Sequence, residues 1–176
     1  MKNIFVDMDG CLAVYDRDAY IARPDTVAEY LIPGYFETCK VDENLVNYLN
    51  MLTSLSEGNV NLYVLTRVPD IRAVGQDIFQ NIASSKVNWM KLKCDLHIES
   101  KNVIITSSSK VSAACQFLKK PKLDKNDILI DDFNNNLVDW KKAGGSAYKY
   151  VNGLNSAETS PCLYFGFGSQ VHVEPM

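Results

Sequence analysis

Short apolar runs alternate with amphipathic patterns along most of the chain. The apolar runs cover residues 3–6, 62–65, 103–105, 128–130 and, more weakly, 147–151. Runs of this length that stop at acidic, hydroxylated or glycine residues are typical of buried strands that end in loops. Because strands and helices alternate, the pattern predicts a parallel sheet that helices cover on both faces.

Helical patterns lie between the apolar runs. Asp42 is placed to cap a helix that carries leucines on one face. Asp70 is placed to cap the next helix, with Ile71, Val74 and Ile78 on its apolar side. We expect two further helices, which begin near residues 109–110 and at residue 134.

Length and composition indicate a single domain. The chain has 176 residues, of which 47% are hydrophobic and 22% are charged, and this is enough for a sizeable core. We therefore expect residues 1–176 to form one domain. Residues from roughly 13 to 41 lack the pattern of regular core elements, so we expect a small cap segment there. No element is predicted for the tail after Gly153.

Charge and cysteine usage narrow the partners and the compartment. A net charge of -3 gives no basic surface, so we expect no nucleic-acid polymer as a partner. Five cysteines without a Cys-x-x-Cys spacing argue against a disulfide framework or a zinc cluster, and favour a reducing cytoplasm. Asp7 and Asp9 would interrupt a signal peptide, and no stretch of about 18 apolar residues is present. We therefore expect a cytoplasmic protein with no membrane span.

Acidic residues follow two of the predicted strands. Asp7 and Asp9 come after the first strand, and Asp131 and Asp132 come after the fourth. Such sheets bind ligands at the carboxyl ends of their strands, where these side chains would meet. Carboxylate oxygens suit a hard ion such as Mg²⁺, and adjacent buried acids are costly unless a cation neutralises them. The alternatives are a turn with acidic capping residues, and a helix cap for one acid of the second pair.

Two further polar residues favour phosphate chemistry over ion binding alone. Thr66 ends the second strand, and Lys110 lies between the third and fourth strands where a helix is expected to begin. A hydroxyl and an ammonium can hold the oxygens of a phosphate and the charge that develops on them. Taken alone, Lys110 would be an ordinary exposed lysine at a helix end.

These residues carry a family resemblance. The segments that resemble, in order, the four motifs of the haloacid dehalogenase (HAD) superfamily are residues 5–12, residues 64–66, Lys110 and residues 129–132. The segments that resemble the 5'(3')-deoxyribonucleotidase branch more closely are residues 12–15, residues 33–36 and the Lys86-x-x-Trp89 segment. The resemblance implies a Rossmann-like three-layer α/β/α core with a parallel sheet and a small cap inserted after the first strand.

The resemblance also implies the roles of the acidic residues. Asp7 would attack phosphorus and form an aspartyl-phosphate, and Asp9 would protonate the leaving oxygen and then help to activate water. Mg²⁺ would be held by the Asp7 side chain, the Asp9 backbone carbonyl and Asp132. Asp131 and Asn136 would support this site.

Substrate contacts follow from the same resemblance. Thr66 and Lys110 would bind phosphate, aided by backbone N–H groups of Met8 and Arg67. The Arg67 side chain would either crowd the site or add a phosphate contact. The candidates to stack on a nucleobase are Tyr15 and Phe36, for which ordinary packing is the alternative.

The expected function is a Mg²⁺-dependent phosphatase that removes the 5'-phosphate from (deoxy)nucleoside monophosphates. One alternative is a HAD phosphatase for another small phosphate ester, and another is a non-catalytic Mg²⁺-binding relative. A receiver-like signalling domain resembles the chain less well, because the second and third strands end in Thr66 and Thr106 rather than in an aspartate that could be phosphorylated.

Overall fold

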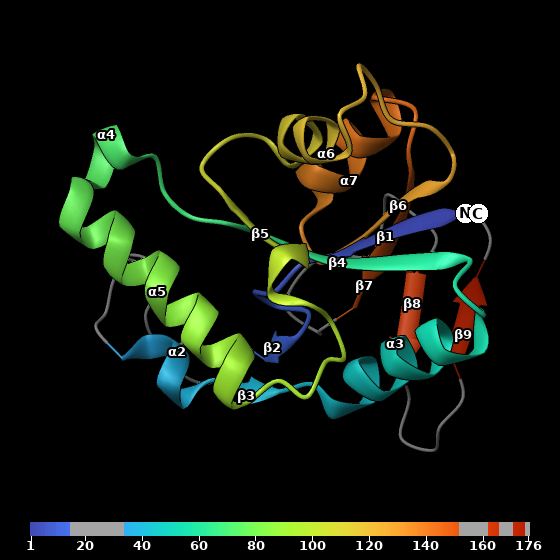
Figure 1. The fold of residues 1–176 in the computed structure, drawn as a ribbon, viewed down its shortest axis with the longest axis horizontal. Coiled ribbons are helices and arrows are strands. Elements are labelled where there is room, and N and C mark those ends of the chain that lie inside the picture. Colours follow the sequence, from blue (N-terminus) through green and yellow to red (C-terminus); the bar gives the residue numbers. More distant parts are fainter. Residues whose placement is uncertain (15–33, 152–161, 166–170, 175–176) are drawn as a thin grey trace.

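The computed structural model describes residues 1–14, 34–151, 162–165 and 171–174. Its main sheet has the strand order β5-β4-β1-β6-β7-β8-β9, in which all neighbours are parallel except the antiparallel pair β8 and β9 (Figure 1). The strands are β1 (Lys2–Val6), β4 (Val60–Arg67), β5 (Val103–Thr106), β6 (Asp127–Asp131), β7 (Ser146–Tyr150), β8 (Cys162–Phe165) and β9 (Val171–Glu174). The first five match the five predicted apolar runs, whereas β8 and β9 lie in the tail for which the sequence predicts no element.

Helices pack on both faces of this sheet. They are α3 (Glu43–Leu55), α5 (Gln76–Leu92), α6 (Lys110–Leu118) and α7 (Asn134–Lys142). The short helix α4 (Ile71–Val74) precedes α5 and has no buried residue, and a 3-10 turn covers Ser100–Asn102. Figure 1 shows α3 and α5 on one side of the sheet, and α6 and α7 on the other. No helix of the described part is long and apolar enough to cross a membrane.

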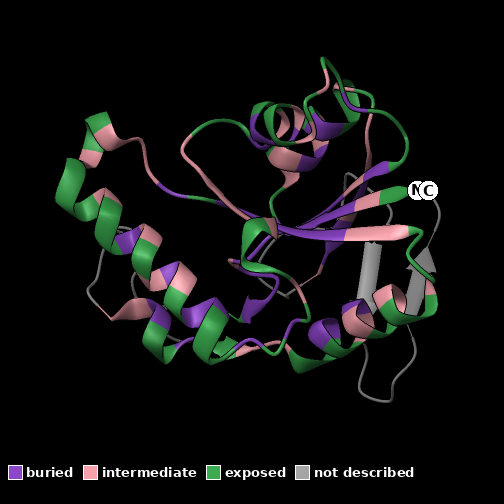
Figure 2. Cartoon of the chain, in the orientation of Figure 1, coloured by how far each residue is buried: buried purple, intermediate pink, exposed green. Residues whose placement is uncertain are grey.

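Alternating side chains of β1 supply two hydrophobic cores, one on each face of the sheet. Ile4 and Val6 belong to the core that includes residues of α3 and α5. Phe5 belongs to the core that includes Leu137 and Trp140 of α7. The central strands are buried while the outer faces of the helices are exposed (Figure 2). The predicted three-layer α/β/α core with a parallel sheet is therefore confirmed.

Capping residues fix where two of the helices begin. The carboxylate of Asp42 accepts a hydrogen bond from the N–H of Leu45 at 3.0 Å, as predicted for the start of α3. The hydroxyl of Ser109 accepts one from the N–H of Ser112 at 3.1 Å and caps α6. Lys110 is consequently fixed as the first residue of α6.

The helix predicted after the second strand is interrupted at Gly75. α4 ends at Val74, and Gly75, with φ 83° and ψ 163°, separates it from α5. This backbone conformation is essentially restricted to glycine, and it cannot continue a helix. The prediction of one apolar side formed by Ile71, Val74 and Ile78 is therefore wrong, since α4 has no buried residue and Ile78 is 43% exposed.

The described ends of the predicted cap segment form a small ribbon. β2 (Ala13–Val14) pairs antiparallel with β3 (Lys40–Val41), which follows the short helix α2 (Tyr35–Thr38). Residues 15–33, which make up most of the predicted cap, lie outside the described residues, and so does the stacking candidate Tyr15. The cap itself stays a prediction.

Candidate active site

The sheet brings the predicted site residues to one edge. β1 lies between β4 and β6 and is parallel to both, so the carboxyl ends of these three strands are adjacent. Asp7 directly follows β1, Thr66 lies one residue before the end of β4, and Asp131 is the last residue of β6.

Asp7 is buried and has one of its two carboxylate oxygens fixed. Its Oδ1 atom accepts a hydrogen bond from the N–H of Met8 at 2.8 Å and lies 2.7 Å from Nζ of Lys110. Its Oδ2 atom has no hydrogen-bond partner among the described residues. The side chain therefore presents one anchored oxygen and one open oxygen.

Lys110 joins Asp7 to the end of β6. Its buried ammonium donates a hydrogen bond to Oδ2 of Asp131 at 2.6 Å. The same Oδ2 atom accepts from Nδ2 of Asn136 at 3.0 Å, and Oδ1 accepts from the N–H of Phe133 at 2.8 Å. Both oxygens of Asp131 are therefore already held by the protein.

Burial dominates the electrostatics of this ion pair. Burial raises the pKa of Asp7 to about 8, because Lys110 opposes the shift only in part and the Asp131 carboxylate adds to it. Burial alone would lower the pKa of Lys110, but the carboxylates of Asp131 and Asp7 outweigh that effect and raise it. Lys110 is therefore a permanent cation, and a second cation beside Asp7 would favour its ionised form.

Three buried carboxylates lie close enough to hold one metal ion. Asp7, Asp131 and Asp132 each offer an oxygen, and these oxygens lie within 4.8 Å of one another. The buried ammonium of Lys149, in β7, donates to the backbone carbonyl of Asp132. An all-oxygen set of carboxylates suits a hard divalent cation such as Mg²⁺.

The Asp9 carboxylate is bound to a different group of residues. Its Oδ2 atom accepts hydrogen bonds from the Thr66 hydroxyl at 3.2 Å and from the Lys86 ammonium. Lys86 also donates to Oγ1 of Thr66 at 2.6 Å and to the backbone carbonyl of Arg67 at 2.7 Å. Because a hydroxyl has a single hydrogen, Thr66 would have to leave Asp9 before it could donate to a phosphate.

Two predicted substrate contacts are placed less favourably. The Arg67 residue is exposed at the end of β4, and its backbone carbonyl accepts from Lys86. Phe36 is 2% exposed and belongs to the hydrophobic core. Its ring is therefore packed within the core, and stacking on a nucleobase stays a prediction.

Two buried lysines near the carboxylates were not among the predicted site residues. The sequence identifies Lys86 only as part of a segment that resembles a family motif, and Lys149 only as part of a weakly predicted strand. The available signal for Lys86 was its position four residues after Ile82 and three before Trp89, which places a lysine on the buried side of α5. Lys149 pairs in register with Asp131 across β6 and β7, but strand periodicity alone did not distinguish it.

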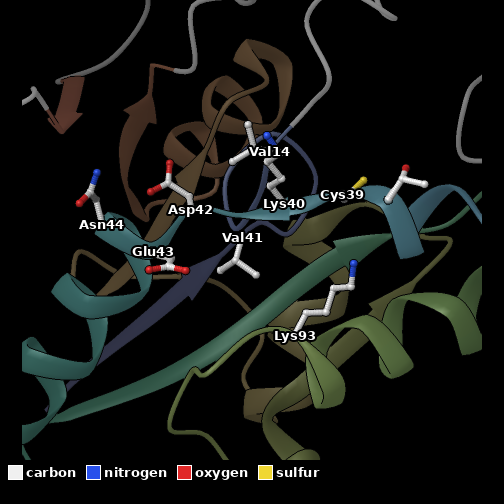
Figure 3. Close-up of a pocket in the computed structure, with 9 residues that line it drawn as sticks. Val14, Cys39, Lys40, Val41, Asp42, Glu43, Asn44 and Lys93 are labelled. Carbon is white, nitrogen blue, oxygen red and sulfur yellow. The ribbon is translucent and has the colours of Figure 1, made fainter.

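A separate pocket of about 530 Å³ lies beside the ribbon of β2 and β3 (Figure 3). The residues that line it are Val14, Thr38, Cys39, Lys40, Val41, Asp42, Glu43, Asn44 and Lys93. None of them is one of the clustered acids Asp7, Asp131 and Asp132, so this pocket is distinct from the site at the sheet edge. It borders the described ends of the predicted cap segment.

Comparisons with known proteins identify the fold. No protein-family model matches the sequence, and no curated protein sequence matches it. One similar solved structure is the D,D-heptose 1.7-bisphosphate phosphatase from B. bronchiseptica complexed with magnesium and phosphate, with 11% identity, a TM-score of 0.54 and 91% of each chain covered. Another is a hydrolase from Pseudomonas syringae, with 14% identity, a TM-score of 0.52, and 89% of this chain and 87% of that chain covered. The chain shares the three-layer Rossmann-like fold of these two enzymes.

Proposed function

We propose that the chain is a Mg²⁺-dependent phosphatase that hydrolyses small phosphate monoesters through a phosphorylated Asp7. The observation that carries this proposal is the buried pair of Asp7 and Lys110 at the end of β1, beside the carboxylates of Asp131 and Asp132. The HAD-type fold supports the same reaction class, as does the order of the four sequence motifs.

The open Oδ2 atom of Asp7 is the proposed nucleophile. It attacks phosphorus while the Met8 N–H and the Lys110 ammonium hold the other oxygen in place. The bond between phosphorus and the leaving oxygen breaks, and that oxygen takes the electron pair and a proton from Asp9. Water then hydrolyses the aspartyl-phosphate, which releases phosphate and restores Asp7. Covalent catalysis of this kind divides one difficult displacement into two easier ones.

The residues at the sheet edge fit a bound Mg²⁺ ion. The carboxyl groups of Asp7, Asp9, Asp131 and Asp132 lie near the ammonium groups of three lysines, so the site carries an excess of negative charge when Asp7 is ionised, and a metal cation would favour that form. Both oxygens of Asp131 are held by other donors, which leaves Asp7, the Asp9 backbone carbonyl and Asp132 as the proposed ligands. When bound, the ion would neutralise phosphate oxygens and favour the ionised form of Asp7.

The first substrate candidate is a (deoxy)nucleoside 5'-monophosphate. This choice rests on the sequence resemblance to the deoxyribonucleotidase branch, since the cap residues that would read a base lie outside the described residues. A second candidate is another small ester such as a sugar phosphate. Two observations favour it, namely the burial of Phe36 and the similarity of the fold to a heptose bisphosphate phosphatase.

A panel assay tests both the chemistry and the substrate. Phosphate release would be measured with Mg²⁺ on nucleoside 5'- and 3'-monophosphates, sugar phosphates and p-nitrophenyl phosphate, with and without a chelator. The Asp7→Asn variant removes the nucleophile with little change in shape, and Asp139→Asn is its control at an exposed site on α7. Turnover that needs Mg²⁺ and Asp7 but not Asp139 supports the proposal. Absence of turnover on every compound would instead favour a non-catalytic Mg²⁺-binding protein.

A further inference from the structure

We propose that Lys86 is a positioning residue that fixes the carboxylate of Asp9 for proton transfer and connects it to α2 through Phe36. The inference rests on the proposed phosphatase activity, in which Asp9 protonates the leaving oxygen. It adds a residue that the sequence analysis did not place in the site.

The hydrogen bonds of Lys86 are fully used within the protein. Its ammonium has three N–H donors, and it meets three acceptors, which are Oδ2 of Asp9, Oγ1 of Thr66 and the carbonyl oxygen of Arg67. Lys110, in contrast, contacts two carboxylates and keeps a third donor. Lys110 is therefore the better placed of the two lysines to reach a phosphate, and Lys86 is the better placed to hold protein groups.

These contacts determine which oxygen of Asp9 is available. Oδ2 is held by Lys86 and Thr66, whereas Oδ1 has no hydrogen-bond partner among the described residues. The Asp9 side chain is 25% exposed, so it would otherwise exchange between rotamers in contact with solvent. Because Oδ2 is held, Oδ1 keeps one orientation. A proton donor with a fixed orientation transfers its proton to the leaving oxygen more efficiently than a mobile one.

Lys86 acts on protein groups alone. All three of its N–H donors have protein acceptors, so its part in the reaction is to hold the Asp9 side chain without touching the substrate.

In addition to its hydrogen bonds, Lys86 contacts an aromatic ring of α2. Its Nζ atom lies 5.2 Å from the centroid of the Phe36 ring, within the range of a cation–π interaction. Phe36 belongs to α2, which packs against α5 and precedes β3 at the end of the predicted cap segment. Phe36 therefore places α2 in contact with the lysine that holds Asp9.

The sequence context argues against a purely structural role. Lys86 is 2% exposed on the side of α5 that also buries Ile82, Trp89 and Met90. Burying an ammonium costs more than burying an apolar side chain of similar size, so Met would complete this face at lower cost. A charged residue on an otherwise apolar helix face departs from the usual pattern, and such departures occur mostly at functional sites.

The test compares two esters of similar shape that differ in the leaving group. Release of p-nitrobenzyl alcohol requires protonation of a basic alkoxide, whereas p-nitrophenolate is a weak base and leaves with little help from a proton donor. We expect Lys86→Met to lower kcat about 100-fold on p-nitrobenzyl phosphate and less than about 10-fold on p-nitrophenyl phosphate. The control Lys91→Met, at an exposed lysine of the same helix, should leave both rates unchanged. A purely structural or phosphate-binding role of Lys86 predicts equal losses on the two esters, and equal losses would overturn the inference.

A second variant keeps the inference testable if Lys86→Met does not fold. Phe36→Leu retains every hydrogen bond of Lys86 and removes only the ring contact. We expect it to lower kcat about threefold more on the p-nitrobenzyl ester than on the p-nitrophenyl ester. Identical effects on both esters would overturn the connection between α2 and Asp9. Failure of the wild-type protein to hydrolyse either ester would contradict the proposed function itself, whereas wild-type turnover with equal losses in the variants contradicts only the role of Lys86.

Discussion

The Lys110 ammonium and the Asp7 carboxylate form an ion pair of 2.7 Å inside the protein. The same ammonium reaches Asp131, so one lysine connects the ends of β1 and β6. Neutralisation of the carboxylates, which the sequence argument assigned to a metal ion, is thus partly achieved by the protein itself. A folded site without metal is consistent with this arrangement.

Replacement of Lys110 should affect stability and catalysis together. Lys110→Met leaves the buried carboxylates of Asp7 and Asp131 without their common cation. We expect it to lower the free energy of unfolding by about 3–5 kcal/mol and to lower kcat at least about 100-fold. Urea unfolding and phosphate release measure the two effects. The control is Lys142→Met, at an exposed lysine of α7, and a comparable loss in that variant would contradict the specific role of Lys110.

Mg²⁺ should raise the melting temperature through Asp132. Binding to the folded state alone stabilises it by about 2.7 kcal/mol when the ion is present at about 100 times its Kd. We expect this stabilisation in the wild-type protein and in Asp139→Asn, and its loss in Asp132→Asn. Thermal melts over a range of MgCl₂ concentrations measure it, with a chelator as the reference. An undiminished shift in Asp132→Asn would remove that residue from the ligand set.

Asp127 should be the main stabilising acid of the lysine-rich loop before β6. It is fully buried, and its carboxylate accepts hydrogen bonds from Nδ2 of Asn3 at 2.9 Å and from the N–H of Asp124 at 2.8 Å, and pairs with Lys120. We expect Asp127→Ala to cost about 1–3 kcal/mol, because it leaves these donors unpaired. The more exposed Asp124→Ala should lower stability much less, because solvent screens its ion pair with Lys120. Similar losses in urea unfolding for the two variants would contradict this assignment.

Gly145 should tolerate no side chain. A Cβ atom there would lie 2.9 Å from the carbonyl oxygen of Asp127 and would also clash with the indole of Trp140, which donates to the same oxygen. We expect Gly145→Ala to lower stability by about 1–3 kcal/mol and to shift the tryptophan fluorescence. Gly75→Ala is the comparison, because its Cβ would meet no atom within 4 Å and only the positive φ is strained. It should lower stability without a fluorescence change, so a shift in both variants would contradict the clash.

The strands and helices could be predicted from the sequence because each is determined mainly by residues within its own short segment. Each of the five core strands is an apolar run, and helix starts such as those at Asp42 and Ser109 depend on side chains that bond their own backbone. The break at Gly75 was not predicted, since a glycine inside a helical pattern is compatible with either outcome. The short strands β8 and β9 lie in a tail whose pattern gives no clear period.

The site could be predicted in its residue types but not in its contacts. The alternation of strands and helices predicts a parallel sheet, whose strand ends share one edge. The strand order, which the sequence did not predict, places β1 beside β6 and so brings Asp7 close to Asp131 and Asp132. The partner of Asp9 was missed, because a lysine on a helix far along the chain reaches it only after the helices pack on the sheet. The burial of Phe36 is likewise a product of tertiary packing, which a single sequence does not reveal.

The most direct test of the account is whether a phosphoryl group is transferred to Asp7. The protein would be mixed with Mg²⁺ and a hydrolysed ester, quenched in acid and digested, and its peptides examined by mass spectrometry. We predict one phosphoryl group on the peptide that contains Asp7, and none on the same peptide of Asp7→Asn. Turnover in Asp7→Asn, or a phosphoryl group trapped on another residue, would contradict the proposed mechanism.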